Sequence, residues 1–274
     1  MSATFARAIA ATARAMTLPL KPWRRQSAQA LAAELLEPAF TVPTDLGALE
    51  FHCPTRQSLH FIREFHIREP ETLTWIRSFR PGAVFWDIGA NVGQFSLYAG
   101  LAPGVRTLAF EPGAASFAAL ARNIEINRMD DRVAAYCLAF DSLTRLTQMN
   151  MARSDAGSSM HAVGTDVDMI GRPIDVKFRQ AVTAYAIDDF IARFNPPFPT
   201  HLKLDVDSIE DKILEGARQT LADPRLRSLL IEIETAPDSE RTRAIHARCA
   251  AGGLAAAGLA QSAQLSANVL FSRA

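Results

Sequence analysis

What this 274-residue chain lacks excludes several classes of protein. Its three cysteines, Cys53, Cys137 and Cys249, are too far apart and odd in number for a disulfide framework or a cysteine metal cluster. No apolar run is long enough to span a bilayer. Because 29 basic and 29 acidic residues cancel, the global charge does not favour binding to nucleic acid. We therefore expect a globular protein of a reducing, cytoplasmic compartment, without a nucleic-acid partner.

The amino-terminal segment lacks negative charge. No acidic residue precedes Glu34, whereas five basic residues do: Arg7, Arg14, Lys21, Arg24 and Arg25. The alanine-rich stretch FARAIAATARAM predicts a helix with Arg7 and Arg14 on roughly one face. One interpretation is a membrane-surface or targeting helix, although the apolar core of a secretory signal is missing. We favour a solvated helix, with at most weak membrane-surface contact.

Residues 84–93, VFWDIGANVG, carry the strongest pattern. An apolar run reaches Asp87, a glycine-containing turn follows, and the helix-like stretch QFSLYAGL comes next. A strand, a tight turn and a helix in this order place a nucleoside at the edge of an α/β sheet. Gly89 would provide the turn and Gly93 the close packing at the start of the helix.

The turn differs from the dinucleotide-binding fingerprint, whose central glycine lets the backbone approach a pyrophosphate. Asn91 stands at that position, and no third glycine follows at the required spacing. A diphosphate therefore fits poorly, whereas a nucleoside without phosphates fits well. S-adenosylmethionine (SAM) is the commonest cofactor of that kind.

A second acid supports a nucleoside site. The short apolar run TLAFEP ends near Glu111, 18 residues beyond Gly93, where a carboxylate can accept hydrogen bonds from both ribose hydroxyls. The order and spacing of these elements argue against ordinary turn glycines and a solvated acid. We assign cofactor binding to the following residues: Asp87, Gly89, Ala90, Asn91, Gly93, Glu111, Pro112 and Asp141.

The chain organisation predicts an amino-terminal helical and mixed extension, residues 1–80, and a catalytic domain, residues 81–274. In the domain, predicted strands and helices alternate. The strands are expected at 84–90, 107–112, 133–140, 201–207 and 228–234. The helices are expected at 92–101, 114–127, 186–194, 209–222 and 238–251. This alternation implies a mostly parallel sheet with helices on both faces. Turn signals in 141–182 predict an inserted hairpin or lid. The carboxyl-terminal stretch predicts a hairpin that adds an antiparallel strand.

Acids cluster where the predicted strands end. Asp205 and Asp207 end the fourth strand, and Glu232 and Glu234 end the fifth. Because ligands bind at the carboxyl ends of parallel strands, these acids should meet in one crevice. They could act as a general base, bind a divalent cation, or complement a positively charged cofactor.

We assign Asp205 and Asp207 as candidate catalytic residues, although Asp207 could instead cap the next helix. No metal ligands are assigned, because no histidine or cysteine spacing indicates zinc and a divalent cation is not established. His161 and His201 are weaker candidates for a base, since a lone histidine is more often structural.

Three stretches resemble the FkbM family of SAM-dependent methyltransferases: VFWDIGANVGQFSLYAG, AFEP with the later RNIEIN, and LKLDVDSIEDKILEGA. The resemblance runs from about Glu69 to the end of the chain. It implies a Rossmann-like seven-stranded sheet with one antiparallel strand near the end, and SAM as cofactor. It also implies that Asp87, Gly89, Asn91, Gly93 and Glu111 hold the cofactor, and that an acceptor-side motif contains Lys203, Asp205, Asp207 and Glu210. Ser208 replaces the glycine usual in that motif.

The expected function is O-methylation of a hydroxyl on a glycan, a glycolipid or another small-molecule acceptor. Two alternatives stay open at this point. One is a nicotinamide-dependent oxidoreductase on a related sheet, which Asn91 disfavours. The other is a non-catalytic protein that binds SAM or a partner. The oligomeric state is open.

Overall fold

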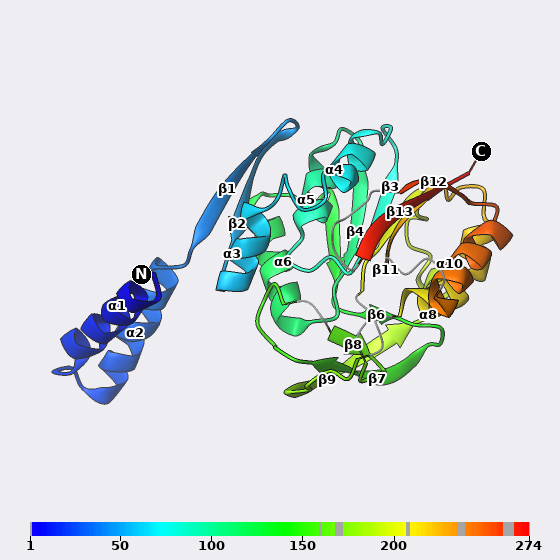
Figure 1. Cartoon of the computed structure of the whole chain (residues 1–274). Coiled ribbons are helices and arrows are strands. Elements are labelled where there is room, and N and C mark those ends of the chain that lie inside the picture. Colours follow the sequence, from blue (N-terminus) through cyan, green and yellow to red (C-terminus); the bar gives the residue numbers. More distant parts are fainter. Residues whose placement is uncertain are drawn as a thin grey trace. The chain divides into compact units, whose positions relative to one another are not determined.

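The computed structural model describes residues 2–158, 161–167, 172–206, 209–234, 239–259 and 266–273. It separates into two compact units, Met1–Ala39 and Phe40–Ala274 (Figure 1). The predicted boundary near residue 80 differs from this division. Residues 40–80 belong to the larger unit because their apolar side chains, among them Phe51, Phe65 and Ile76, are buried in the same core as Phe85.

The first unit is a pair of helices, α1 (Ser2–Thr17) and α2 (Pro22–Leu35). Pro22 lies in the first turn of α2, where a missing N–H costs nothing. The Arg25 guanidinium donates to the carbonyls of Thr17, Leu18 and Leu20 at 2.6–3.3 Å, which neutralises the carboxyl-terminal end of α1. No residue of α2 is buried, so this unit has no hydrophobic core of its own.

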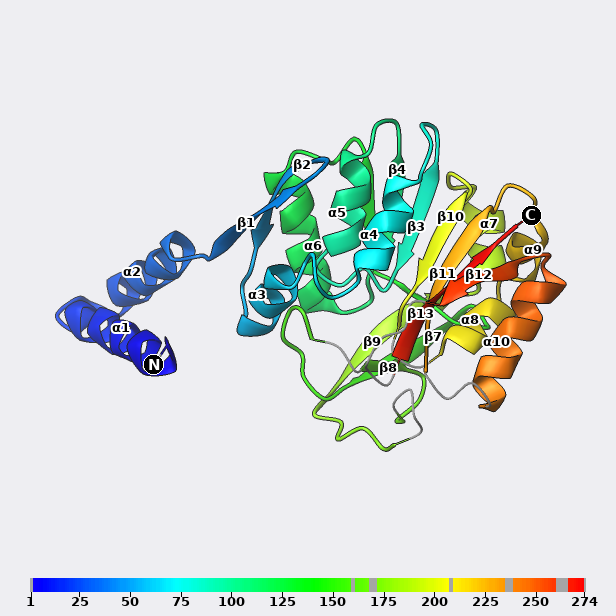
Figure 2. The ribbon, with the colours of Figure 1, turned by 45° about the horizontal axis from the view of Figure 1, so that its top comes forward.

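The second unit is built on a seven-stranded sheet with the order β12-β13-β11-β10-β3-β4-β5 (Figure 2). Its strands are β3 (Val84–Ile88), β4 (Arg106–Phe110), β5 (Val133–Tyr136), β10 (His201–Leu204), β11 (Ser228–Glu234), β12 (Ala255–Leu259) and β13 (Ser266–Ser272). β13 runs antiparallel to both of its neighbours, whereas β5, β4, β3, β10 and β11 are parallel to one another. The predicted fold class is confirmed.

The strand order creates a crevice beside β3. The chain adds β4 and β5 on one side of β3 and then returns to add β10 on its other side. Connections therefore leave β3 and β10 in opposite directions, which opens a space at their carboxyl ends. This switch point lies where the sequence places the glycine turn and Asp205.

Helices cover both faces of the sheet, and side-chain alternation along β3 explains why. Phe85 is buried in the cluster that includes α3 (Arg56–Arg63), α4 (Pro70–Arg77), α5 (Gln94–Leu101) and α6 (Ala114–Ile126). The next residue, Trp86, is buried in the cluster on the other face, which includes α7 (Ile187–Phe194), α8 (Glu210–Glu215), α9 (Arg218–Ala222) and α10 (Glu240–Ala251). No helix within the described parts of the chain is long and apolar enough to cross a membrane.

Residues 39–63 lie in the predicted mixed extension. The structure has a hairpin there, β1 (Ala39–Thr44) and β2 (Gly47–His52), followed by α3. The backbone N–H groups of Glu50 and His52 donate to the side-chain oxygens of Asn127 and Asn123, at 2.9 and 2.7 Å. These bonds attach β2 to α6. No sequence pattern indicated this pairing, because it joins residues more than 70 positions apart.

The insertion forms a separate four-stranded sheet with the order β6-β9-β7-β8. Its strands are β6 (Ala139–Phe140), β7 (Arg145–Met151), β8 (His161–Val163) and β9 (Phe178–Tyr185). β7 and β9 pair in antiparallel fashion over seven residue pairs, as a hairpin does. Two other predicted elements are divided: the helix at 209–222 becomes α8 and α9, and the strand at 133–140 becomes β5 and β6.

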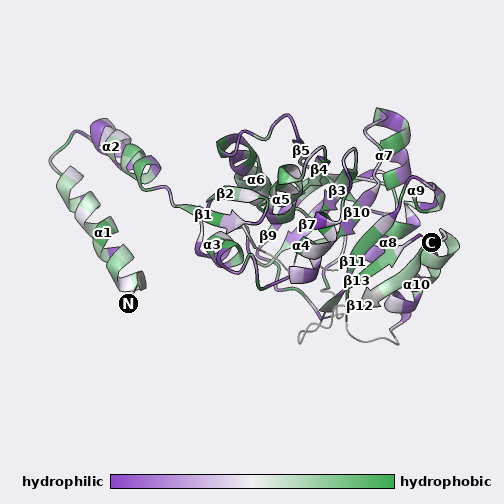
Figure 3. Cartoon of the chain, turned by 90° about the horizontal axis from the view of Figure 1, so that it is seen from above, coloured by the Kyte–Doolittle hydropathy of each residue, from purple (hydrophilic) through white to green (hydrophobic). Residues whose placement is uncertain are grey.

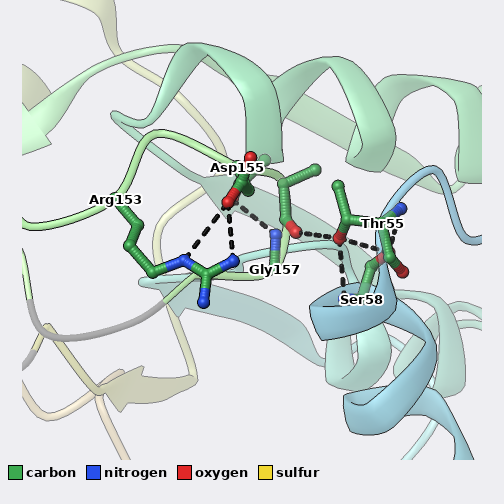
Figure 4. Close-up of polar contacts among 7 residues, drawn as sticks. Thr55, Ser58, Arg153, Asp155 and Gly157 are labelled. Carbon is green, nitrogen blue, oxygen red and sulfur yellow. Dashed lines mark hydrogen bonds and ion pairs between the residues drawn. The ribbon is translucent and has the colours of Figure 1, made fainter. Parts of the chain in front are cut away.

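The loop after β7 is hydrogen-bonded to the start of α3 (Figure 4). Thr55 Oγ1 donates to the Ala156 carbonyl at 2.6 Å, and the Gly157 N–H donates to Ser116 Oγ at 3.2 Å. Gly157 has φ +80°, and a Cβ on it would lie 2.7 Å from the backbone of Ser58. Only glycine therefore permits this close contact.

We expect Gly157→Ala to destabilise the protein by about 2–4 kcal/mol, because backbone strain and overpacking act together. Gly82→Ala is the matched control. Gly82 also has a positive φ, +87°, but a Cβ on it would meet no atom within 4 Å. The control should cost only about 1 kcal/mol. Urea unfolding of both variants measures the difference, and equal losses would show that the Ser58 contact is unimportant.

Candidate functional site

A cavity opens at the carboxyl ends of the central strands. The turn after β3, Glu111 and Pro112 after β4, and Asp205 after β10 line it. The lining is completed from the α3 region and from the insertion by Phe61, Arg68, Glu69, Met149, Ser158 and His161. Its volume is about 1170 Å³ with the solvent at its mouth.

The glycine turn is shaped by contacts between neighbouring elements. A Cβ on Gly89 would lie 1.8 Å from the Asp205 carbonyl oxygen, so glycine allows the ends of β3 and β10 to touch. A Cβ on Gly93 would lie 2.5 Å from Leu120 Cδ1, which explains the close packing of α5 on α6. Gly89 lines the cavity, whereas Gly93 does not.

Asn91 and Glu111 form the part of the lining that best suits a nucleoside cofactor. Glu111 Oε2 accepts from the Asn91 N–H at 2.9 Å, and Oε1 accepts from the Gly113 N–H at 2.7 Å. These two backbone groups hold the carboxylate in one orientation. Asn91 Oδ1 is buried, and it has no hydrogen-bond partner within the described residues. It is therefore an acceptor available to a donor group of a bound ligand.

Asp87 lies behind the cavity wall rather than in its lining. It is fully buried, and Ser96 Oγ donates to its Oδ2 at 2.5 Å. Burial raises the pKa of Asp87, and the nearby Lys203 ammonium opposes that shift. Asp87 and Lys203 face each other in the register of β3 and β10. Asp87 thus lies beneath the site, beside the Lys203 ammonium.

Asp141, like Asp87 and Gly93, is a predicted cofactor residue that does not line the cavity. It is buried, and Arg145 donates to its Oδ2 from Nε and Nη2 at 3.0 and 2.6 Å. Its Oδ1 accepts from the Ser142 N–H at 2.7 Å. Both carboxylate oxygens therefore stabilise the start of the insertion. The predicted residues that do line the cavity are Gly89, Ala90, Asn91, Glu111 and Pro112.

Lys203 links the acids of the site. Its side chain is almost completely buried, its Nζ lies 2.5 Å from Asp205 and 3.6 Å from Glu69, and it sits 4.9 Å from the centroid of the Phe95 ring. Burial alone would lower the pKa of Lys203, but Asp205, Glu69 and Asp87 raise it overall. Lys203 is therefore a permanent cation and not a base. The sequence did not indicate Glu69 as its partner.

Asp205 is partly exposed in the cavity, with 24% of its side chain accessible. Burial raises its pKa, but the Lys203 ammonium, a hydrogen bond with Glu232 and the charge of Arg68 lower the pKa overall. Glu69 behaves differently: burial raises its pKa, and Lys203 only partly opposes this. Asp205 is thus the ionised acid of this group at neutral pH.

The structure describes Glu210 of the predicted acceptor-side motif but not Asp207 or Ser208. Glu210 does not line the cavity; it is fully buried, pairs with Arg241, and accepts from the Val206 N–H at 3.2 Å. It therefore attaches the start of α8 to α10. Asp207 and Ser208 lie outside the described residues, as does the side chain of Glu234.

The two histidines have different surroundings. His201 stacks on Phe79 with ring centroids 4.0 Å apart, and burial lowers its pKa to about 4, so it belongs to the core. His161 lines the cavity from β8. Burial lowers the pKa of His161, which keeps its imidazole neutral, and its Nδ1 has no partner in the described part of the chain.

The described residues contain no group of three or more histidine, cysteine or acidic side chains arranged to hold a metal ion. The lining does fit SAM. Asn91 Oδ1 and the oriented Glu111 carboxylate would be acceptors for its amino and ribose hydroxyl donors. The ionised Asp205 carboxylate in the lining suits a cationic sulfonium.

We expect Lys203→Met to destabilise the protein by about 3–5 kcal/mol, because it leaves buried carboxylates without their cation. Lys177→Met is the control, since Lys177 pairs with Asp175 at an exposed position and should cost less than about 1 kcal/mol. Urea unfolding checks both.

In the Lys203 variant, the carboxylate pKa values of the folded state rise above the unfolded values of about 4. The loss should therefore be larger at about pH 8 than at about pH 5, where the folded state binds the extra protons. Equal losses for both lysines would contradict this description.

Comparison with known proteins agrees with the site. A family model described as the methyltransferase FkbM domain matches residues 87–250, more than half of the chain. The protein 31-O-demethyl-FK506 methyltransferase FkbM of Streptomyces tacrolimicus is 32% identical over 174 residues. The match covers 56% of this chain and 66% of that relative, so the chain spans slightly less than two thirds of the relative's length.

Two solved structures are distantly similar. Precorrin-6y C5,15-methyltransferase from Geobacter metallireducens GS-15 has a TM-score of 0.45 and 11% identity, and the match covers 75% of this chain and 87% of the other. M. capricolum TrmK in complex with S-adenosyl-homocysteine has a TM-score of 0.43 and 7% identity, covering 73% and 67%. The fold assignment rests on the strand order, and the family assignment on the match over residues 87–250. The chain belongs to the FkbM family of SAM-dependent methyltransferases.

Proposed function

We propose that the protein transfers the SAM methyl group to a hydroxyl oxygen of a glycan, a glycolipid or another small molecule. The observation that carries this proposal is that one cavity contains both the acceptors suited to a nucleoside and an ionised acid, Asp205. The relative from Streptomyces tacrolimicus, whose name describes methyl transfer to an O-demethyl small molecule, supports the choice of oxygen. Membership of a methyltransferase family favours methyl transfer over hydride transfer to a nicotinamide.

The cofactor half of the proposal uses the β3 and β4 ends. The Glu111 carboxylate accepts from the ribose hydroxyls, and Asn91 Oδ1 accepts from the amino group of the methionine part. Gly89 and Ala90 line the cavity, and a Cβ on Gly89 would clash with the Asp205 carbonyl oxygen. When bound, SAM supplies a methyl group that its sulfonium sulfur already activates. The protein then has to align the acceptor oxygen with that methyl group, and alignment alone can lower a barrier by about 7–11 kcal/mol.

The acceptor half uses Asp205, together with Asp207 from the sequence motif. The hydroxyl oxygen forms a bond to the methyl carbon while the bond from carbon to sulfur breaks, and the hydroxyl proton must leave. The Asp205 carboxylate is an acceptor that orients the hydroxyl and receives this proton. Its paired Lys203 weakens it as a base. His161 is therefore a second candidate, because its neutral imidazole keeps Nδ1 available in the same cavity.

The insertion supplies part of the cavity wall. Met149, Ser158 and His161 come from 141–182 and line the cavity, so this insertion would cover the acceptor and exclude water. Residues 81–274 would contain all the groups that contact the cofactor.

The three cysteines are unpaired, which suits a reducing, cytoplasmic location.

Glu111→Ala should weaken SAM binding by about 1.5–3 kcal/mol, roughly 10- to 150-fold, because it removes hydrogen bonds to a charged group. Glu125→Ala is the control, since Glu125 is an exposed acid on α6 paired with Arg122. Its affinity should match the wild type. Isothermal calorimetry measures both, and thermal unfolding verifies that each variant folds. Unchanged affinity in folded Glu111→Ala, or tighter binding of NAD than of SAM, would overturn the cofactor assignment.

Asp205→Asn should keep SAM affinity within about threefold and lower methyl transfer by about 100-fold or more, because it removes the charge and keeps the shape. The assay follows labelled methyl from SAM to a panel of sugars, glycolipids and small-molecule alcohols. His161→Gln is measured in parallel. If Asp205→Asn stays within a few-fold of wild type while His161→Gln loses the activity, the histidine is the base. If both retain activity, neither accepts the proton.

A further inference from the structure

The first helix has an apolar stripe that nothing in its own unit covers. At 100° per residue, Phe5, Ile9 and Met16 of α1 project within about 40° of one another. Their side chains are 71%, 45% and 76% exposed. Arg7 and Arg14 project from the opposite side of the same helix. α1 is therefore amphipathic, with an apolar stripe and a basic face. Figure 3 shows α1 mostly in the green of hydrophobic residues.

The stripe is not used to join the two helices. The partly buried positions of the pair are small or polar: Ala13, Thr17, Arg25, Ala28, Gln29 and Ala32. Gln29 Nε2 donates to Thr17 Oγ1 at 2.9 Å, and Arg25 donates to the end of α1. Further apolar side chains of the pair remain exposed, Trp23 by 62% and Leu35 by 77%. So much exposed apolar surface on 34 residues indicates a binding partner.

Charge identifies the kind of partner. No acidic residue precedes Glu34, so two copies of this pair would repel each other through their arginines and lysines. A negatively charged surface would attract them. Arg25 is occupied by carbonyls of its own unit, which leaves Arg7, Arg14 and their neighbours for that surface. Apolar side chains with tryptophan beside basic ones are the composition of helices that lie in a lipid interface.

We propose that the helix pair, residues 2–35, docks on an anionic lipid surface, with the stripe Phe5, Ile9 and Met16 inserted among the acyl chains. This goes beyond the weak contact expected from charge alone, because the exposed stripe adds an apolar contribution to the basic one. It does not depend on the identity of the methyl acceptor.

The full chain should sediment with vesicles of phosphatidylcholine that contain about 30% phosphatidylglycerol, and about 0.5 M salt should release most of it. Vesicles of phosphatidylcholine alone should bind at least about tenfold less protein. A wild-type chain that binds neither vesicle, or both equally, would overturn the proposal.

Two double variants test the stripe. Phe5→Ser with Met16→Ser should lower the partition coefficient about tenfold or more, because two apolar side chains are lost from the interface. Leu143→Ser with Leu146→Ser is the matched control, since these leucines are 65% and 83% exposed in the other unit. The control should bind vesicles as the wild type does. Equal losses in both variants would show that the stripe is not the docking surface.

Arg7→Gln with Arg14→Gln tests the charge. This variant should bind anionic vesicles less tightly, and its remaining binding should depend less on salt. Circular dichroism and SAM affinity verify that every variant folds. Light scattering gives the competing outcome: an oligomer that Phe5→Ser with Met16→Ser dissolves would make the stripe a contact between copies of the chain and would overturn lipid docking.

Discussion

The buried Lys203 ammonium is the interaction on which the site depends. It joins Asp205 at the end of β10 to Glu69 at the start of α4, and it faces Asp87 across the strand pair. Three acids near a nucleoside site would repel one another if this cation were absent. Because Lys203 sits among them, Asp205 remains ionised in the cavity, whereas burial raises the pKa of Glu69 and of Asp87. That arrangement suits a cofactor that carries a positive sulfonium.

Backbone contacts explain why the same residues serve both fold and site. Gly89 lets the ends of β3 and β10 meet, so the turn proposed to receive the cofactor is also the point where the strand order changes. The Asn91 N–H orients Glu111, which connects the β3 turn to the β4 end. A change at either position would therefore alter cofactor geometry through the backbone as well as through lost contacts.

The sequence predicted the parts of the protein whose signals are local. Alternation of strands and helices predicted the parallel sheet, and glycine spacing predicted the turn, since both depend on neighbouring residues. Glu69, Phe61 and Arg68 were not predicted to line the cavity, because they reach it only through the packing of α3 and α4. The partners of Asp141 were not predicted either: Arg145 and the Ser142 N–H donate to its two carboxylate oxygens. The hydrogen-bond partners of a carboxylate determine its role, and these partners are set by the tertiary structure.

A crystal structure of the full chain with S-adenosylhomocysteine would show directly how the cavity holds the cofactor. We expect the ribose hydroxyls within hydrogen-bond distance of Glu111, the amino group near Asn91 Oδ1, and the sulfur facing the side of the cavity that contains Asp205. A ligand bound elsewhere, or a sulfur directed away from Asp205 with Glu111 not in contact with the ribose, would contradict this expectation.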